Sequence, residues 1–172
     1  MSVEFALAAG PCAGVLVGSR PLITAHVESF EQTLPELMPL LPIHYKELAL
    51  NQDDVPLDPQ YDLYIERERL GQVIMVSLRE AGKLIGYFIG FVAPGLHYKT
   101  CLTCTMDIFY VHPEHRGSSG GLILFKALEA ELKRRGVKRW LVGSKCHMDA
   151  SALFERLGFE RVEVYYSKML GA

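Results

Sequence analysis

The ten-residue stretch HPEHRGSSGG (112–121) joins a run rich in β-branched and aromatic residues to a run with helical spacing. A surface turn requires only two or three permissive residues, but this one contains three glycines, two serines and an arginine. Small residues between a strand and a helix direct unpaired backbone N–H groups and the positive end of the helix dipole to one place. The stretch therefore predicts an anion-binding turn, with an ordinary glycine-rich connection as the alternative.

Composition indicates one globular domain. The chain has 172 residues, 49% hydrophobic and 22% charged, which suffices for one substantial core. Its formal net charge of −2 gives no bulk attraction for nucleic acid or an anionic membrane. The apolar stretches are too interrupted for a membrane span. Residues 5–17 are apolar, but they lack the preceding Lys or Arg of a secretory signal. Four cysteines in a chain of this size suit reduced thiols. We therefore expect a cytoplasmic protein.

Periodicity and turn residues divide the front half into elements. We expect a strand over 21–27, short helices bent by prolines over 28–50 and a further helix over 58–71. Two strands joined by a turn at 80–83 are expected over 72–92, and another strand over 98–111. Asp58 is the expected N-cap of the third helical segment, and Gly71 its stop. Residues 1–20 are expected to form an N-terminal extension of two short apolar pieces, which suits a small hairpin.

The back half alternates helix and strand. Leucines four apart and a favourable Glu129–Lys133 pair predict a helix that ends at Gly136. A strand, a short helix stopping at Gly158 and a last strand are expected over 138–144, 149–158 and 161–170. This order predicts a mixed α/β fold of the α+β type, with an antiparallel front half, in a single domain over 1–172.

The glycine-rich stretch departs from the common nucleotide-binding loops. It lacks the Gly-Lys-Ser/Thr ending of a Walker loop. A dinucleotide fingerprint belongs to a parallel strand-helix-strand unit, which the antiparallel front half contradicts. A nucleotide-binding regulatory domain is therefore excluded.

Residues 116–121, Arg-Gly-Ser-Ser-Gly-Gly, resemble motif A of the GNAT superfamily of acyl-CoA N-acyltransferases, where Arg/Gln-x-x-Gly-x-Gly/Ala binds the coenzyme A pyrophosphate. Ser119 stands in place of the first glycine. The stretch HMDASALFERLGF (147–159) is similar to a second family element, Asn-x-x-Ala-x-x-x-Tyr-x-x-x-Gly-Phe, although His147 replaces the Asn and Phe154 the Tyr. The phrase NQDDVPLDP is similar to phage-encoded members.

The resemblance implies a mixed, mostly antiparallel twisted sheet of about six or seven strands flanked by about four helices, splayed between the strands around 105–112 and 138–144. The gap would take the pantetheine arm of acetyl-CoA as co-substrate, and no metal is implied. The implied cofactor-binding residues are Phe109, Tyr110, Val111, Arg116, Gly117, Ser118, Ser119, Gly120, Gly121, Leu122 and Phe154.

Asp107 is the candidate general base. A carboxylate within an apolar strand is costly to bury unpaired, so it requires an explanation. Strand alternation is expected to put Thr105, Asp107 and Phe109 on one face. An alkylamine at pH 7 is neutral only about once in 10³, a deficit of roughly 4–5 kcal/mol that a base would offset. The alternative role for Asp107 is to order a neighbouring loop.

The general acid is less clearly indicated, because Phe154 has no hydroxyl. His147 and Tyr165 are the candidates, with Tyr166, Ser151 and solvent as alternatives. Capping of the following helix is the structural alternative for His147.

Acceptor-binding residues are expected in two regions. His44 and Glu47 lie among the broken helices, and His97 and Tyr98 lie in the stretch APGLHYKT (93–100). A solvated helix face is the alternative for the first pair. A protein N-terminus, a lysine, a polyamine and an aminoglycoside all remain open as acceptors, and a homodimer is compatible with the resemblance.

Two groups of residues could in principle bind a metal, but we expect structural roles for both. Cys101 and Cys104 are three residues apart on a strand and so are expected on opposite faces. The group of His112, Glu114 and His115 is expected to form turn contacts.

The sequence thus predicts an N-acyltransferase that passes acetyl from acetyl-CoA to a primary amine by direct attack in a ternary complex. The alternative is a catalytically inactive acyl-CoA-binding sensor or partner-binding module. Phe154 favours the alternative, whereas Asp107 favours the enzyme.

Overall fold

The computed structural model describes residues 22–170, so the expected N-terminal hairpin lies outside the described residues. The elements are β1 (Ile23–Val27), α1 (Phe30–Leu37), α2 (Leu41–Leu48), α3 (Tyr61–Arg69), β2 (Val73–Glu80), β3 (Lys83–Gly95), β4 (Tyr98–Val111), the 3₁₀ turn η1 (Pro113–His115), α4 (Gly120–Arg134), β5 (Arg139–Leu141) and α5 (Ser151–Arg156). No helix within 22–170 is long and apolar enough to cross a membrane.

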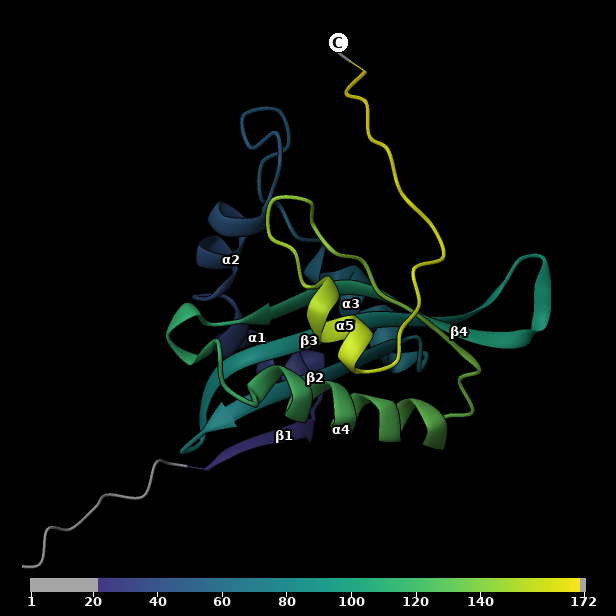
Figure 1. Cartoon of the computed structure of the whole chain (residues 1–172), viewed down its shortest axis with the longest axis horizontal. Helices are drawn as coiled ribbons and strands as arrows, with labels where there is room; N and C mark the ends of the chain where they lie inside the picture. The colour runs from purple at the N-terminus through teal and green to yellow at the C-terminus, as the bar shows by residue number, and fades with distance from the viewer. Residues whose placement is uncertain (1–21, 171–172) are drawn as a thin grey trace, which may run out of the picture.

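The strands form one mixed sheet between two helical layers. Among the described residues its order is β1-β2-β3-β4-β5, antiparallel up to β4, and β5 is parallel to β4. Figure 1 shows α4 and α5 on the near face of the sheet and α1 to α3 on the far face. The mixed, mostly antiparallel fold is confirmed, with five strands where about six or seven were expected.

The expectation of a last strand over 161–170 is wrong. These residues pair with no strand in the described part of the chain and are exposed throughout. The segment is rich in strand-forming residues, but strand propensity produces a strand only where a partner edge is within reach. In Figure 1 the yellow segment runs out beyond the sheet instead.

Each face of the sheet has its own core, because side chains alternate along a strand. On β2, Ile74 and Leu78 pack toward α4 and α5, whereas Val73 and Met75 pack toward α1 to α3. A strand covered on both faces requires an unbroken apolar run, which explains the sequence VIMVSL.

Local turn chemistry fixes the front half. Ala81 and Gly82, between β2 and β3, both have positive φ values (49° and 82°), as a two-residue type I′ hairpin turn requires.

The expected cap at Asp58 is wrong: α3 begins at Tyr61, and Gln60 precedes it without a side-chain cap. Pro59 lies outside the helix, and its carbonyl accepts from the Tyr61 N–H. Because the chain turns helical only after this contact, Asp58 is too far upstream to cap it.

Strands β4 and β5 pair over a short distance and then separate. Only Thr103–Thr105 of β4 pair with β5, and their partners are Arg139–Leu141. Strand β4 continues to Val111, but the chain leaves β5 at Val142. Residues 106–111 therefore lack a strand partner on that side within the described chain, which confirms the expected splay.

A β-bulge interrupts β4 beside this gap. Ile89 of β3 is opposite Ile108, but Gly90 is opposite Met106, so Asp107 is an extra residue in β4. An extra residue reverses the alternation beyond it. Phe109 consequently packs on the α4 side, while Asp107 contacts α3 on the other face. The expectation that they share a face is wrong for this reason.

Candidate active site

The glycine-rich turn keeps backbone N–H groups free at the start of α4. The hydroxyl of Ser118 donates to the His115 carbonyl at 2.7 Å and accepts from the Gly120 N–H at 3.2 Å. The helical ladder begins with the N–H of Ile123, which donates to the carbonyl of Ser119. The N–H groups of residues 121 and 122 precede that first bond, so no helical carbonyl can accept from them. The turn thus offers donors and the positive end of a fifteen-residue helix.

The two glycines at the start of α4 permit close packing. A Cβ at Gly120 would lie 2.9 Å from Cδ2 of Leu78 on β2, and one at Gly121 would lie 3.2 Å from Cδ2 of Leu153 on α5. Ser119 has φ −75° and ψ 0°, a backbone conformation open to any residue. The departure from the family pattern at this position therefore causes no backbone strain.

Arg116 is held at the end of β4 by three partners. Its Nε donates to the carbonyl of Val111 at 2.7 Å, and its guanidinium lies 5.6 Å from the centre of the Tyr110 ring. The two terminal nitrogens bond both carboxylate oxygens of Glu47 on α2, one of them at 2.7 Å. This bidentate contact lowers the pKa of Glu47. The residue predicted for the acceptor wall is therefore bound to the residue predicted for the pyrophosphate.

Asp107 faces α3, where Tyr64 donates its hydroxyl proton to Oδ2 at 2.5 Å. The surrounding protein desolvates the carboxylate and raises the pKa of Asp107, and the Tyr64 hydrogen bond opposes part of that rise. Asp107 is nevertheless exposed to solvent, so a substrate can reach it. A poorly solvated carboxylate that remains accessible is suited to accept a proton.

Sequence reasoning missed Tyr64. The helical pattern of 58–71 indicated a helix, but which of its faces would meet the strand containing Asp107 depends on packing. The ring of Tyr64 stacks between Phe30 and Phe91, with centroids 4.9 Å and 5.6 Å away. This packing fixes the hydroxyl beside Asp107.

His44 lies in an aromatic layer behind the glycine-rich turn. Its Nδ1 is 2.9 Å from the Tyr87 hydroxyl, and its ring stacks on Tyr110 at 4.7 Å. Burial lowers the pKa of His44 to about 4, so the imidazole is neutral at pH 7. The buried Tyr110 hydroxyl has no hydrogen-bond partner among the described residues. His44 thus adjoins the Arg116 contact rather than Asp107.

The residues considered for the general-acid step do not contact Asp107. His147 is exposed in the loop before α5, where Asp149, not His147, accepts from the N–H of Ser151. Tyr165 is 81% exposed on the C-terminal segment, and its hydroxyl donates to Glu163 at 3.3 Å. Phe154 is buried in the core under α4.

His97 and Tyr98 lie at the far end of the β3–β4 hairpin. Tyr98 lies nine positions before Asp107 in β4, roughly 30 Å of extended chain. The guanidinium of Arg139 lies 5.4 Å from the centre of the Tyr98 ring. The structure therefore does not bring this pair to the carboxylate.

The potential metal ligands have other contacts. Cys104 is buried in the core on the α4 side, and the Cys101 thiol lies 3.9 Å from the Thr103 hydroxyl. Ligand atoms of His112, Glu114 and His115 lie within 4.8 Å of one another. His115 also lies 3.4 Å from Glu80, so this group ties η1 to the end of β2.

A splayed parallel strand pair, a bulged strand with a carboxylate and an N–H-rich turn at the end of that strand define a GNAT-like transferase fold. The model of the acetyltransferase (GNAT) family matches residues 37–159, well over half of the chain. The chain belongs to the GNAT acetyltransferase family, which confirms the resemblance seen in the sequence. No curated protein matches it.

Solved structures share the fold at low sequence identity. A ribosomal-protein-alanine N-acetyltransferase from Brucella melitensis biovar Abortus 2308 is 18% identical with a TM-score of 0.65, over 87% of this chain and 100% of that chain. An aminoglycoside acetyltransferase from an uncultured soil metagenomic sample, in complex with sisomicin, is 13% identical with a TM-score of 0.66, over 87% and 97%. A predicted acetyltransferase with acetyl-CoA from Clostridium acetobutylicum is 15% identical with a TM-score of 0.64, over 87% and 97%.

Proposed function

We propose that the protein is an N-acyltransferase that passes an acetyl group from acetyl-CoA to a primary amine by direct attack in a ternary complex. The open backbone of residues 106–111, which leads directly to the N–H-rich turn, carries the proposal. This arrangement matches a ligand with an amide-containing arm and a pyrophosphate at its end. Family membership and the fold shared with an acetyltransferase holding acetyl-CoA support the same co-substrate.

The residues present fit acetyl-CoA as a substrate. The pyrophosphate would bind the free N–H groups of Gly121 and Leu122 and the guanidinium of Arg116. The pantetheine amides would pair with the open backbone around Phe109–Val111. Because Glu47 occupies the same guanidinium nitrogens, the pyrophosphate must displace or share that contact.

Asp107 would accept the amine proton, directly or through water. The amine nitrogen attacks the thioester carbonyl, the new N–C bond forms, the C–S bond breaks, and the thiolate takes a proton from solvent. A carboxylate whose pKa is raised is a stronger base, provided that it is ionised at the working pH. Tyr64 would hold the carboxylate in position.

An acyl-CoA-binding sensor is the second candidate. The observation in its favour is that Phe154, at the position where the family often has a tyrosine, is 6% exposed and carries no hydroxyl. A sensor would use the same cofactor groove without needing Asp107.

Calorimetric titration with acetyl-CoA tests the cofactor claim, with ATP and NAD as controls. Micromolar binding of acetyl-CoA alone is expected. Release of free thiol is then measured with an N-terminal peptide, a polyamine and an aminoglycoside, in the native protein and in Asp107→Asn. Binding with Asp107-dependent thiol release supports the transferase, and binding without release from any amine supports the sensor. Folded, ligand-free protein that does not bind would overturn both.

A further inference from the structure

Side chains of the kind that bind metal ions gather at η1, between the end of β4 and the glycine-rich turn. Ligand atoms of His112, Glu114 and His115 lie within 4.8 Å of one another. A carboxylate oxygen of Glu114 lies 3.7 Å from Nδ1 of His112. Glu80, at the end of β2, lies 3.4 Å from Nδ1 of His115. Imidazole nitrogens combined with carboxylate oxygens are a ligand set that Zn²⁺ and similar transition metals accept.

The backbone holds the two histidines in place. The His112 N–H donates to the Ile85 carbonyl of β3 at 2.8 Å, and the His115 N–H donates to the His112 carbonyl at 2.9 Å. Pro113, between them, has a fixed φ. Both imidazoles are half-buried, whereas the Glu114 side chain is 81% exposed. A metal ion would therefore meet two nitrogens already positioned, and only an exposed carboxylate would have to move toward it.

The required movement is small. Ligand atoms around a tetrahedral zinc ion lie roughly 3.3 Å apart, because each bond to the ion is about 2.0–2.1 Å long. The His112–Glu114 separation of 3.7 Å is close to that spacing. The third ligand, at up to 4.8 Å from the others, requires a change of side-chain rotamer and not of the backbone.

One nitrogen of this group has an unmet bonding capacity. Nδ1 of His112 is buried and has no hydrogen-bond partner among the described residues. The Glu114 oxygen at 3.7 Å is too distant for a hydrogen bond. A buried polar atom without a partner costs free energy, and an unseen ion is one of the recognised reasons for such an atom. A metal ion at η1 would satisfy it.

The carboxylates suit a divalent cation. Glu80 lies outside the group of three but adjoins His115. A carboxylate in this position keeps a metal-binding histidine oriented, since a partner at one ring nitrogen leaves the other nitrogen for the ion. The negative charges of Glu80 and Glu114 would also balance the two positive charges of the ion.

We propose that His112, Glu114 and His115 bind a divalent transition-metal ion of the zinc type, with Glu80 as the outer partner of His115. Water would complete the coordination, as it does at zinc sites with three protein ligands. The ion would strengthen the turn contacts that already join η1 to the end of β2. The inference goes beyond the proposed function and does not depend on it, because none of these side chains has a role in acetyl-CoA binding or proton transfer there.

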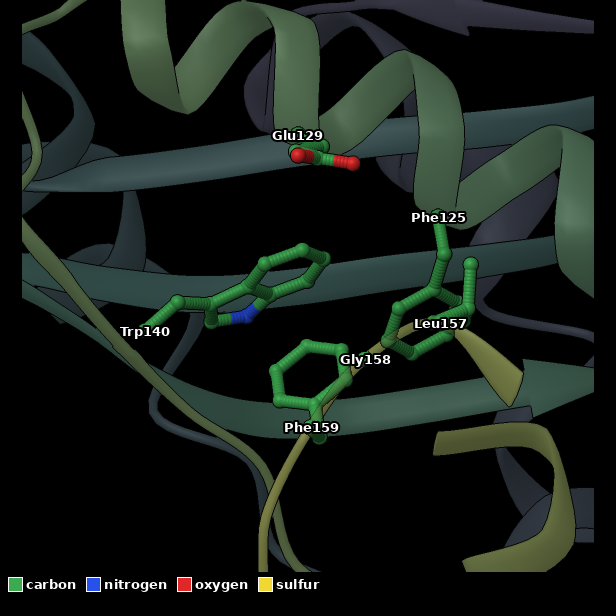
Figure 2. Close-up of a pocket in the computed structure, with 6 residues that line it drawn as sticks. All are labelled: Phe125, Glu129, Trp140, Leu157, Gly158 and Phe159. Carbon is green, nitrogen blue, oxygen red and sulfur yellow. The ribbon is translucent and has the colours of Figure 1, made fainter. Parts of the chain in front are cut away.

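Two other places on the molecule serve as comparisons. Figure 2 shows the pocket between α4 and β5, where aromatic rings surround a single carboxylate, Glu129. That carboxylate already pairs with Lys133, so the pocket lacks the several ligands that a zinc ion needs. The loop before α5 has an exposed cysteine beside an exposed histidine, Cys146 and His147, which is the rival that the experiment must exclude.

The test titrates the full chain, stripped of metal with a chelator, with Zn²⁺ by calorimetry and with Co²⁺ by visible absorption. One Zn²⁺ per chain is expected to bind. Mg²⁺, which prefers oxygen ligands, should not bind. The Co²⁺ spectrum should be more intense than that of the ion in water. The variant Cys146→Ser/His147→Asn is the matched control and should bind Zn²⁺ as the native protein does.

The variants at η1 should lose affinity in a graded way. Glu80→Gln should weaken Zn²⁺ binding about 10–100-fold, the usual cost of losing an outer partner. Glu114→Gln, which removes a ligand, should weaken it at least as much. His112→Asn/His115→Asn should abolish binding and the Co²⁺ absorption. Urea unfolding checks that each variant is folded, and Glu114→Gln keeps the test decisive because its exposed side chain is not part of the core.

Four results would contradict the proposal. The first is Zn²⁺ binding no tighter than Mg²⁺ binding, and the second is Zn²⁺ binding that survives the double histidine substitution. The third is equal Zn²⁺ affinity in the native protein, Glu80→Gln and Glu114→Gln, which would mean an adventitious ion only. The fourth is loss of binding in Cys146→Ser/His147→Asn, which would place the ion on the loop before α5.

Discussion

At the residue scale, two opposite charges, Arg116 and Glu47, meet at the end of β4 beside the glycine-rich turn. Arg116 is one-third exposed and is paired with Glu47. The same guanidinium cannot give its two terminal nitrogens fully to a carboxylate and to a pyrophosphate. We therefore expect Glu47 to weaken acetyl-CoA binding and Arg116 to strengthen it.

Arg116→Ala should weaken acetyl-CoA binding by about 1.5–3 kcal/mol, the range for hydrogen bonds to a charged group. Titration calorimetry measures the change, and urea unfolding confirms that the variant is folded. Arg116→Lys should recover only part of the affinity, because an ammonium cannot reproduce the two-pronged contact. Unchanged affinity in the alanine variant would exclude Arg116 from the cofactor site.

Glu47→Gln should strengthen acetyl-CoA binding a few-fold, under about 1 kcal/mol, because a partly exposed ion pair contributes little and its loss frees the guanidinium. The matched control is Glu114→Gln, whose side chain is 81% exposed near the same turn. Weaker binding in Glu47→Gln alone would mean that Glu47 positions Arg116 for the ligand instead of competing with it.

Tyr64→Phe should shift the acidic limb of the kcat/KM profile to higher pH. The Tyr64 hydrogen bond lowers the pKa of Asp107, so its removal raises that pKa further. In the proposed reaction Asp107 must be ionised to accept a proton, so the rate should begin to fall at a higher pH as the solution is acidified. Asp107→Asn should slow turnover by about 10²–10⁴ with near-normal acetyl-CoA binding. A profile that Tyr64→Phe leaves unmoved would assign Asp107 a structural role.

At the element scale, most boundaries follow from local pattern, whereas contacts between elements do not. The turn at Ala81–Gly82 and the helix that ends before Gly136 were predictable because their signals lie within a few residues. The bulge at Asp107 was not, because it depends on the register of β4 against β3. The strand expected over 161–170 is absent for the same reason: its pattern is strand-like, but no strand among the described residues pairs with it.

The start of α4 gives a packing prediction. Gly120→Ala should destabilise the protein by about 1–3 kcal/mol, because the new Cβ would lie 2.9 Å from fully buried Leu78. Gly143→Ala is the control, since its φ is not in the left-handed region and nothing lies within 4 Å of the added carbon. Urea unfolding compares the two free energies. Equal stability of the two variants would show that β2 and α4 separate easily.

At the scale of the whole molecule, the proposed function puts co-substrate binding and proton transfer along one strand, β4. The N–H-rich turn before α4 was predictable, because its signal lies in consecutive residues. The positions of the residues expected at the acceptor were less predictable. Glu47 contacts Arg116 beside the glycine-rich turn, and His44 stacks on Tyr110. His97 and Tyr98 lie at the far end of the β3–β4 hairpin. Those positions depend on how three helices pack on the sheet, which spacing alone does not encode.

Global stability should decline in acid partly through Glu131. Hydrogen bonds from Arg134 and Arg135 lower its pKa from 4.5 to about 2. A depressed pKa contributes stability that is fully present above about pH 4.5 and is lost as pH falls toward 2. Glu131→Gln should therefore cost about 1–2 kcal/mol at pH 7, reduced by solvent screening around Arg134, and little near pH 2. Urea unfolding at both pH values measures it, and a pH-independent difference would contradict this account.

The bulge at Asp107 shifts the alternation of side chains along β4 by one residue, as a frameshift shifts the codons after it. Upstream of it, even-numbered positions such as Cys104 and Met106 face α4; downstream, the odd-numbered Phe109 and Val111 do. Deleting one residue there would restore regular alternation and send Phe109 toward α3 and Tyr110 toward α4. The length of this strand is therefore constrained as tightly as its composition, and single-residue deletions should be far less tolerated here than substitutions.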